Sequence, residues 1–223
     1  MSGPGQRVLS LLRKMIMDGE LAAGQRVLEI PTSELLGVSR MPVRMAFRVL
    51  EQEGLLVRQG IRGFNVRPMT LENLVGAVEV RGVLEGLAAR QAAERGVTSD
   101  TKAKLMKCLE QGDRLFEKGY VTEEDLAEYH DINRRFHQAI IEASGNEVVA
   151  MALVRNAQMP FASVDALAVD RENLGQEYRR FNFAHMQHHD VVEAMLLGQG
   201  GRAEAIMREH ANVTLRYARL MSV

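Results

Sequence analysis

The fold of the N-terminal part of the chain depends on the sequence LLGVSRMPVRMAF, which occupies residues 35–47. Gly37 ends a short helical segment that begins at residues 31–32, and Ser39 is a favoured N-cap residue for a second helix. Pro42 falls in the first turn of that helix, where the missing N–H of a proline does no harm. The stretch therefore predicts two helices joined by a tight turn, the second of them running to about Glu53.

The flanking segments extend this pattern on both sides. Residues 6–18 carry apolar side chains at the spacing of an amphipathic helix. After the second helix, residues 55–57 and 64–66 predict two short strands around a turn at residues 59–63. Helix, helix, turn, helix and hairpin, in this order, are typical of a winged helix-turn-helix.

Arginines recur every four residues along the second helix of the turn, at Arg40, Arg44 and Arg48, and therefore share one face. Further arginines lie in and beside the predicted hairpin, at Arg58, Arg62 and Arg67. On its own, such a stripe is more often a solvated surface. On a helix that follows a tight turn it suits the major groove of DNA, because a guanidinium pairs bidentately with guanine or with phosphate.

Charge is divided unevenly along the chain. The formal net charge of the 223 residues is −1, which by itself argues against a nucleic-acid partner. Residues 1–70, however, hold 10 Lys and Arg against 6 Asp and Glu, and residues 71–223 hold the other 18 and 23. A basic part of +4 is therefore joined to an acidic part of −5, and we expect two domains, at residues 1–69 and 70–223.

The composition is that of an ordinary globular protein, with 46% hydrophobic and 26% charged residues. A single cysteine, Cys108, excludes an internal disulfide framework and fits a reducing cytoplasm. No run approaches the roughly 20 apolar residues of a membrane span, and the N-terminus does not resemble a signal peptide. We therefore expect a cytoplasmic protein that does not associate with membranes.

From residue 70 onward, apolar residues repeat at helical spacing, and no stretch alternates as a strand would. Glycines and short polar stretches separate the candidate helices, at about residues 71–95, 99–118, 123–143, 147–166, 171–198 and 201–220. The second domain is therefore predicted to be an all-helical bundle.

Histidines in this second part are spaced for metal binding. Asn133 and His137 stand four residues apart and share a helix face, while His188 and His210 fall on the last two predicted helices. Three imidazoles and one oxygen ligand suit a divalent transition metal such as Zn or Ni. A single histidine is more often a surface or core residue, and all six histidines of the chain lie in this part. Spacing alone therefore leaves the metal site open.

The first domain resembles the GntR-type bacterial transcription regulators. The resemblance covers residues 6–67, including LEQEGLL at residues 50–56 and the glycine-bounded turn at residues 60–63. The Thr-Pro-Val-Arg-Glu-Ala usual in that family is here Met-Pro-Val-Arg-Met-Ala, with Met41 and Met45 at two normally polar positions. The resemblance implies that a winged helix-turn-helix binds operator DNA and that its wing reaches the minor groove. The residues implied to contact the DNA are Ser39, Arg40, Arg44, Arg48, Gly60 and Arg62.

The second domain resembles the FCD-type effector domain of the FadR-like branch, over about residues 71–215. The similar motifs are VEVRGVLE at residues 78–85, FHQAI at residues 136–140, and two later motifs that contain His188 and His210. The family's metal ligands, one Asp and three His, carry over to Asn133, His137, His188 and His210. An amide brings no negative charge, so metal should bind less tightly than in the family, and Asp131 should point off that helix face.

Arg81 is the candidate for recognising an effector. The resemblance implies that effectors are small organic acids, and an arginine beside a metal can clamp a carboxylate with two hydrogen bonds. The alternative is an exposed arginine that pairs with Glu85, four residues further on. The role of His185 is open, and His189 is expected to be a bystander.

These observations predict a homodimeric, ligand-responsive transcription regulator, expected to be a repressor and not an enzyme. The two winged helices would read operator half-sites about one helical turn apart or less. One alternative is a metal-dependent hydrolase with a nucleic-acid-binding appendage, for which Glu142 and Glu193 are the candidate general bases. Another is a regulator in which the metal is purely structural or is itself the signal.

Overall fold

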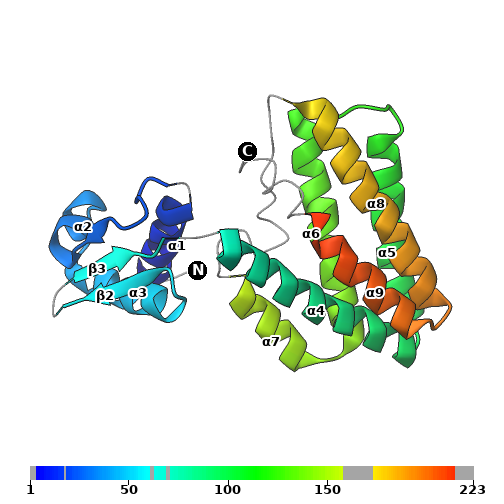
Figure 1. Ribbon diagram of the computed structural model, residues 1–223, viewed down its shortest axis with the longest axis horizontal. Coiled ribbons are helices and arrows are strands. Elements are labelled where there is room, and N and C mark those ends of the chain that lie inside the picture. Colours follow the sequence, from blue (N-terminus) through cyan, green and yellow to red (C-terminus); the bar gives the residue numbers. More distant parts are fainter. Residues whose placement is uncertain (1–3, 18, 61–62, 69–70, 158–172, 214–223) are drawn as a thin grey trace. The chain divides into compact units, whose positions relative to one another are not determined.

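The computed structural model describes residues 4–17, 19–60, 63–68, 71–157 and 173–213 (Figure 1). The chain forms two compact units, Met1–Thr70 and Leu71–Val223. The first combines helices with a small sheet, and the second consists of helices joined by turns, with no strand in its described residues. The predicted fold class, a winged helix-turn-helix followed by a helical bundle, is confirmed. No helix in the described ranges is long and apolar enough to cross a membrane.

The N-terminal unit packs helices against a three-stranded antiparallel sheet of order β1-β3-β2. Its elements are α1 (Pro4–Met17), β1 (Arg26–Val27), α2 (Glu29–Leu35), α3 (Arg40–Gln52), β2 (Leu56–Gln59) and β3 (Gly63–Val66). One face of α3 is buried, because Val43, Phe47 and Leu50 join a core shared with α1 and the sheet. The same packing turns the other face of α3 outward.

Three details of this unit differ from the sequence predictions. The sheet has a third strand, β1, whose two residues are too few to produce a recognisable alternation. The strand predicted at residues 55–57 begins one residue later, at Leu56. Ser39 occupies the N-cap position of α3, but its side chain makes no capping hydrogen bond. The turn before α3 is instead closed by backbone hydrogen bonds, such as that from Val38 N to Ser33 O at 3.0 Å.

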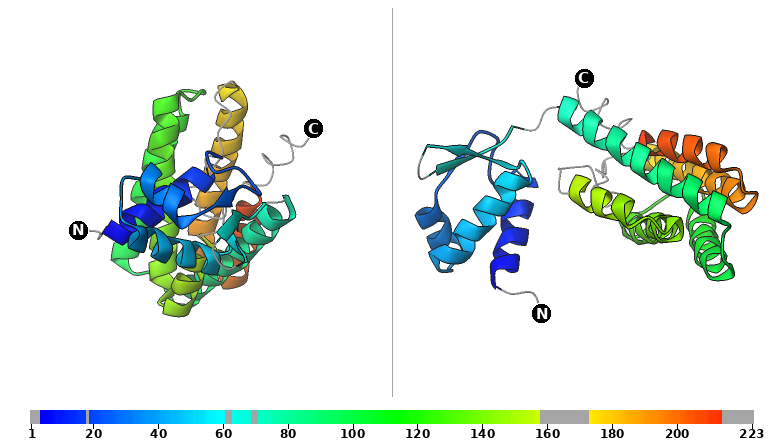
Figure 2. Two further views of the ribbon diagram at one scale, coloured as in Figure 1. Left: turned by 90° about the vertical axis from the view of Figure 1, so that its left-hand side faces the viewer. Right: turned by 90° about the horizontal axis from the view of Figure 1, so that it is seen from below.

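The C-terminal unit is a bundle in which α4 packs against α6, α7 and α9, and α8 packs against α5 and α9 (Figures 1 and 2). Its helices are α4 (Leu71–Arg95), α5 (Ser99–Phe116), α6 (Glu123–Ser144), α7 (Glu147–Asn156), α8 (Leu174–Leu196) and α9 (Gly200–Ala211). Of the helices predicted at residues 147–166 and 201–220, the structure describes α7 to Asn156 and α9 to Ala211. The remainder of these two predictions falls mostly on residues 158–172 and 214–223, outside the described ranges.

Local signals explain the boundaries of α6, which carries part of the candidate site. Thr122 and Asp125 form a reciprocal capping box at its start, and Gly145 ends it in the left-handed conformation. The buried face of α6 includes Ile132, Phe136 and Ile140, which belong to the main core of the unit. This packing directs the neighbouring His137 inward as well.

Small residues allow α9 to approach α4 closely. A Cβ atom at Gly86 of α4 would lie 2.7 Å from Arg208 Cγ and 3.0 Å from the Glu204 carbonyl oxygen, both on α9. Four alanines of α4 are fully or almost fully buried in the same core, namely Ala88, Ala89, Ala92 and Ala93. The close packing of the two helices brings His210 of α9 near the acidic and basic side chains of α4.

Candidate DNA-reading helix and metal centre

Helix α3 presents its arginine stripe on the surface of the N-terminal unit. Arg40 and Arg48 are exposed, and Arg44 is half-buried. Arg44 forms a bidentate pair with Glu29 of α2, with its Nε 2.9 Å from Oε1 and its Nη2 2.9 Å from Oε2. Arg40 Nη2 lies 3.6 Å from the same carboxylate. The sequence analysis did not identify Glu29, which faces both Arg40 and Arg44 in the protein without DNA.

The arginines surround a surface hollow of about 730 Å³. Arg40, Arg44 and Arg48 line it from α3, and Arg58 lines it from β2, above the ring of Phe64. Hydrogen bonds from Arg44 lower the pKa of Glu29, so this carboxylate in the lining of the hollow is ionised. A basic hollow beside an exposed helix suits the phosphate backbone of DNA.

Two of the remaining predicted DNA contacts adjoin elements that line this hollow, and the third lies outside the described residues. Ser39 is exposed immediately before α3, and Gly60 follows β2 with a positive φ of 67°. Arg62 falls outside the described residues. Met41 and Met45 are exposed on α3, with 60% and 50% of their surface accessible. The two methionines therefore do not belong to the core, and they stand on the helix that carries the arginine stripe.

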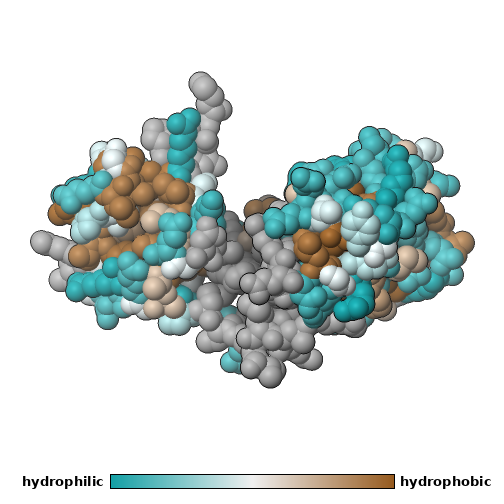
Figure 3. Space-filling model, turned by 90° about the horizontal axis from the view of Figure 1, so that it is seen from above, coloured by the Kyte–Doolittle hydropathy of each residue, from teal (hydrophilic) through white to brown (hydrophobic). Residues whose placement is uncertain are grey.

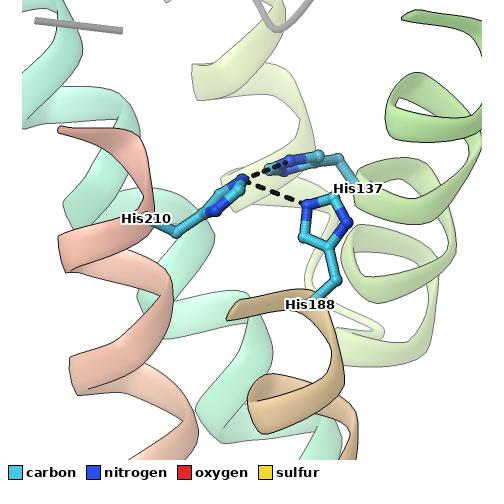
Figure 4. Close-up of side chains that lie close together, drawn as sticks. All are labelled: His137, His188 and His210. Atoms are coloured by element: carbon cyan, nitrogen blue, oxygen red, sulfur yellow. Dashed lines mark hydrogen bonds between the residues drawn. The ribbon is translucent and has the colours of Figure 1, made fainter. Parts of the chain in front are cut away.

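Three histidines from three helices converge in the interior of the C-terminal unit (Figure 4). His210 Nε2 lies 3.2 Å from His188 Nε2 and 3.3 Å from His137 Nε2. All three side chains are buried. In a tetrahedral site with metal–nitrogen bonds of about 2.0–2.1 Å, neighbouring ligand atoms lie about 3.3 Å apart. Both distances from His210 Nε2 are therefore already those that such a metal requires, and the three ligand atoms all lie within 4.8 Å of one another.

The outer nitrogens of two of these rings face oxygen atoms. His137 Nδ1 lies 3.2 Å from Glu85 Oε2, and His210 Nδ1 lies 3.2 Å from Gln187 Oε1. The oxygen of the Gln187 amide can only accept a hydrogen bond, so His210 Nδ1 carries the proton in the neutral ring and His210 Nε2 presents its lone pair toward the other two rings. Three converging imidazole nitrogens with a carboxylate behind one of them are a donor set that fits a divalent transition metal.

Burial keeps two of the three histidines in the protonation state that a metal needs. Burial lowers the pKa of His188 well below its ordinary value and that of His210 to about 3. Burial also raises the pKa of Glu85, but the neighbouring His137 and Arg81 outweigh it and bring this pKa to about 2. At neutral pH, His188 and His210 are therefore uncharged and Glu85 is a carboxylate.

Glu85 is a site residue that the sequence did not identify as one. It is 2% exposed, contacts His137, and lies 3.8 Å from Arg81 Nε. Arg81 is itself buried and donates a hydrogen bond to the Ala211 carbonyl oxygen at 3.2 Å. The alternative of an exposed Arg81 is therefore wrong, although its pairing with Glu85 is present. The available sequence signal for Glu85 was its i,i+4 spacing from Arg81 within a largely apolar helix.

Two further predicted positions lie on α6. Asn133 is buried one turn before His137. Asp131 is half exposed, and its carboxylate pairs with Arg134 and Arg135 on its own helix. The expectation that Asp131 points away from the cluster agrees with these contacts.

The other polar candidates have partners outside the cluster of three histidines. Glu142 is exposed and accepts a hydrogen bond from Gln138 at 2.9 Å, and the exposed Glu193 pairs with Arg202 at 2.7 Å. Neither glutamate stands beside the cluster as a general base would. His185 and His189 contact a different carboxylate, that of Asp113.

Comparisons with known proteins agree with both halves of this description. Residues 4–66 match the model for bacterial regulatory proteins of the gntR family, and residues 77–213 match the model for the FCD domain. The chain is 28% identical to the Glc operon transcriptional activator of Escherichia coli over 91% of its own length and 84% of that protein. It is 31% identical to the regulator YdhC of Bacillus subtilis over 60% of its length, an alignment that spans only 58% of YdhC.

Solved structures show the same fold. The structure of Escherichia coli McbR/YncC superposes with a TM-score of 0.66 at 21% identity, covering 100% of both chains. The glycines, apolar spacing and histidine motifs thus occur within a shared architecture of two domains. The chain belongs to the GntR family of bacterial regulatory proteins, in the group with an FCD domain, and is a DNA-binding transcription regulator, not an enzyme.

Proposed function

We propose that this regulator is a homodimeric, cytoplasmic repressor whose FCD domain binds a small organic acid together with a divalent metal, Zn or Ni. The observation that carries the proposal is the convergence of three buried histidines, with His210 Nε2 within 3.3 Å of the Nε2 atoms of His137 and His188 and with Glu85 behind His137. Effector binding would change the relative population of dimer arrangements that fit the operator, which requires different effector affinities for those arrangements.

His137, His188 and His210 would hold the metal, and the amide oxygen of Asn133 is the candidate fourth ligand. The family's acid is missing at Asn133, but Glu85 supplies a negative charge through its contact with His137. A carboxylate behind a ligating histidine fixes the tautomer and raises the basicity of the ring. Glu85 thus compensates in part for the lost charge. When bound, the metal supplies a Lewis-acidic position for an oxygen of the effector.

Arg81 would orient the effector's carboxylate. Its guanidinium lies next to Glu85, which in turn contacts His137, so Arg81 is connected to the histidine cluster through one side chain. The carboxylate of the effector would replace Glu85 in some of its interactions with the Arg81 guanidinium. Arg81 also donates a hydrogen bond to the Ala211 carbonyl oxygen, so a shift of its guanidinium toward the effector would alter this contact at the C-terminal end of α9.

Operator recognition would use the hollow on the N-terminal unit. Arg40, Arg44 and Arg48 are the proposed base or phosphate contacts, with Ser39 at the turn and Gly60 and Arg62 in the wing. Repression is proposed because two relatives carry that description. One is a probable D-xylose utilization operon repressor of Paenarthrobacter nicotinovorans, 44% identical over 35% of this chain, and the other is RspR of Escherichia coli.

Dimerisation would bury apolar side chains that a single chain exposes. Seen from above, the C-terminal unit has a hydrophobic patch within a mainly hydrophilic surface (Figure 3). Large apolar residues are also exposed on α4 and on α7, the helix at the bottom of this unit in Figure 1, namely Val80, Val83, Val148, Met151 and Val154. Exposed apolar patches of this kind are typical of surfaces that contact other proteins.

Thermal unfolding of the full-length protein tests the sensing part of the proposal. Zn²⁺ or Ni²⁺ should raise the melting temperature of the wild type more than that of His137→Ala. Members of a panel of small organic acids should raise it further only when metal is present. The same acid should change the protein's affinity for DNA taken from upstream of its own gene.

Each alternative has its own result in this experiment. If an acid stabilises the metal-free protein equally, the metal is not part of the effector site. If metal stabilises but no acid changes DNA affinity, the metal is structural, and if metal alone changes DNA affinity, the metal is the signal. Absence of salt-dependent binding to any such DNA would overturn operator recognition.

A further inference from the structure

A second group of metal-ligating side chains lies between α5 and α8. His185 and His189 stand one turn apart on α8, and Asp113 of α5 faces both. The Nε2 atoms of His185 and His189 lie 2.9 Å and 2.8 Å from the same oxygen, Asp113 Oδ1. One ligand atom from each of the three residues lies within 4.8 Å of the other two.

The packing of the two helices holds His185 in this position. Its side chain is 2% exposed, and its ring lies directly against Gly112 of α5. A Cβ atom at Gly112 would come within 2.2 Å of His185 Cε1, so glycine is required there for the ring to fit. The ring of Phe116 packs nearby, with its centroid 5.5 Å from that of His185. His185 therefore has little freedom to turn its Nε2 away from Asp113.

We propose that Asp113, His185 and His189 form a second metal site, which takes a late divalent transition metal such as Zn²⁺, Ni²⁺ or Co²⁺. Two histidines at i and i+4 on one helix face, with a third ligand from a neighbouring element, are a ligand set that zinc uses. Imidazole nitrogens with one carboxylate exclude Mg²⁺ and Ca²⁺ as preferred occupants, because those ions choose oxygen ligands.

The geometry needs only a small adjustment to bind the ion. Ligand atoms around a tetrahedral metal lie about 3.3 Å apart, which is roughly half an ångström more than the two distances to Asp113 Oδ1. The side chains of Asp113 and His189 are 52% and 34% exposed, so they have room to open. Their exposure also leaves positions for water ligands and a path for the ion to enter.

The protonation states agree with this assignment. Burial lowers the pKa of His185, so this ring is neutral at pH 7. Partial burial raises the pKa of Asp113, but hydrogen bonds from His185 and His189 outweigh it and hold that pKa below its ordinary value. A carboxylate is therefore available as a ligand. Each Nε2 donates to Asp113 Oδ1 in the metal-free protein, so a bound metal would take the place of these two protons and the neutral rings would carry theirs on Nδ1.

This second site shares no ligand with the cluster of His137, His188 and His210. The rings of His185 and His188 are nevertheless neighbours on α8, with centroids 6.0 Å apart. An ion at the second site would join α5 to α8 and restrain the helix that also carries His188. The second site is thus placed to stabilise the bundle beside the first.

A cobalt titration of the metal-free, full-length protein tests the proposal, because bound Co²⁺ is visible in the absorption spectrum and its number per chain can be counted. The wild type should bind two Co²⁺ per chain, and Zn²⁺ should displace both. His189→Ala and Asp113→Asn should each retain one ion and weaken the other at least tenfold. Asp190→Ala, which removes an exposed acid from α8 beside His189, should still bind two.

The outcomes separate this site from the one in the proposed function. If the wild type binds one ion, which is lost in His137→Ala and kept in His189→Ala, the second site is refuted and the first stands. If the single ion is lost in His189→Ala and kept in His137→Ala, the second site stands and the first is refuted. If His189→Ala and Asp113→Asn both bind two ions with wild-type affinity, the second site is refuted.

Discussion

The two units place their polar side chains in opposite ways. Among the described residues of the N-terminal unit, Thr32 and Ser33 are the buried polar side chains, and the arginines of α3 lie at or near the surface. In the C-terminal unit the buried polar side chains include charged and titratable groups, namely Arg81, Glu85, Asn133, His137, Ser144, Glu177, His185, Gln187, His188 and His210.

This difference reflects the two kinds of ligand. An exposed arginine costs little free energy and acts on a polyanion that approaches from outside. A buried charge costs several kcal/mol unless it is paired, and removing one partner of a buried pair leaves the other uncompensated. The buried polar side chains of the C-terminal unit are therefore placed to act on a small ligand or an ion that enters the core.

Lowering the pH should produce the largest difference in stability between the two units. Below about pH 6.5 the unfolded chain protonates His188 and His210, whereas the folded chain holds the pKa of His210 at about 3. The unfolded state then binds more protons, so the free energy of unfolding falls as the pH drops from about 6.5 toward 3, by several kcal/mol. Protection of amides from hydrogen exchange at pH 7 and pH 5 measures the loss.

The N-terminal unit provides the internal control for this experiment. None of the six histidines lies in residues 1–70, so protection in α3 should change little over the same range. Equal losses in α3 and α8 would contradict a stability effect of the buried histidines.

Removing a buried charge should be the next largest effect. Arg81→Met leaves Glu85 without its arginine partner and should lower the free energy of unfolding by about 3–5 kcal/mol. Arg48→Met removes an exposed arginine and should change it by less than about 0.5 kcal/mol. Urea unfolding of the two variants compares a core charge with a surface charge, and similar losses would remove the contrast between the units.

Glu85→Gln should weaken metal binding by about 10–100-fold, because the carboxylate that orients His137 is lost. Calorimetric titration with Zn²⁺ measures the change, and His189→Ala can serve as background if the second site also binds. Glu79→Gln removes an exposed acid from the same helix and should bind as the wild type does. An unchanged affinity in Glu85→Gln would show that Glu85 does not assist the metal.

Arg44→Ala should weaken operator binding by about 1–3 kcal/mol if Arg44 reads a base. Arg44 must leave Glu29 to contact DNA. Glu29→Gln weakens this pair and leaves Arg44 less ordered, so it should change operator affinity less than Arg44→Ala does. Arg114→Ala, on the C-terminal unit, is the control. Gel-shift titrations at fixed salt measure these affinities, and equal binding by Arg44→Ala and Arg114→Ala would exclude Arg44 as a contact.

Much of the fold could be predicted from the sequence because the signals are local. The spacing of apolar residues, the glycines after helices and the proline in α3 act within a few residues, and they predict α3 to α6 closely. β1 was missed because two residues carry no period, and the strand exists only through its pairing with β3.

The candidate sites were predictable to a different degree. His137, His188 and His210 could be grouped through a family motif, but Glu85 and Asp113 could not. Each of these acids is an ordinary helix residue until a histidine from another helix approaches it, within 3.2 Å of Glu85 and 2.9 Å of Asp113.

The sequence by itself determined the order of the two domains, the helix-turn-helix, the arginine stripe and the division of charge, because each depends on spacing along one segment. Only the tertiary structure decided which polar residues are buried and which face one another. The close approach of α9 to α4 at Gly86 and of α8 to α5 at Gly112 sets those contacts. Contacts between helices depend on how whole surfaces pack, and no local pattern of residues specifies that packing.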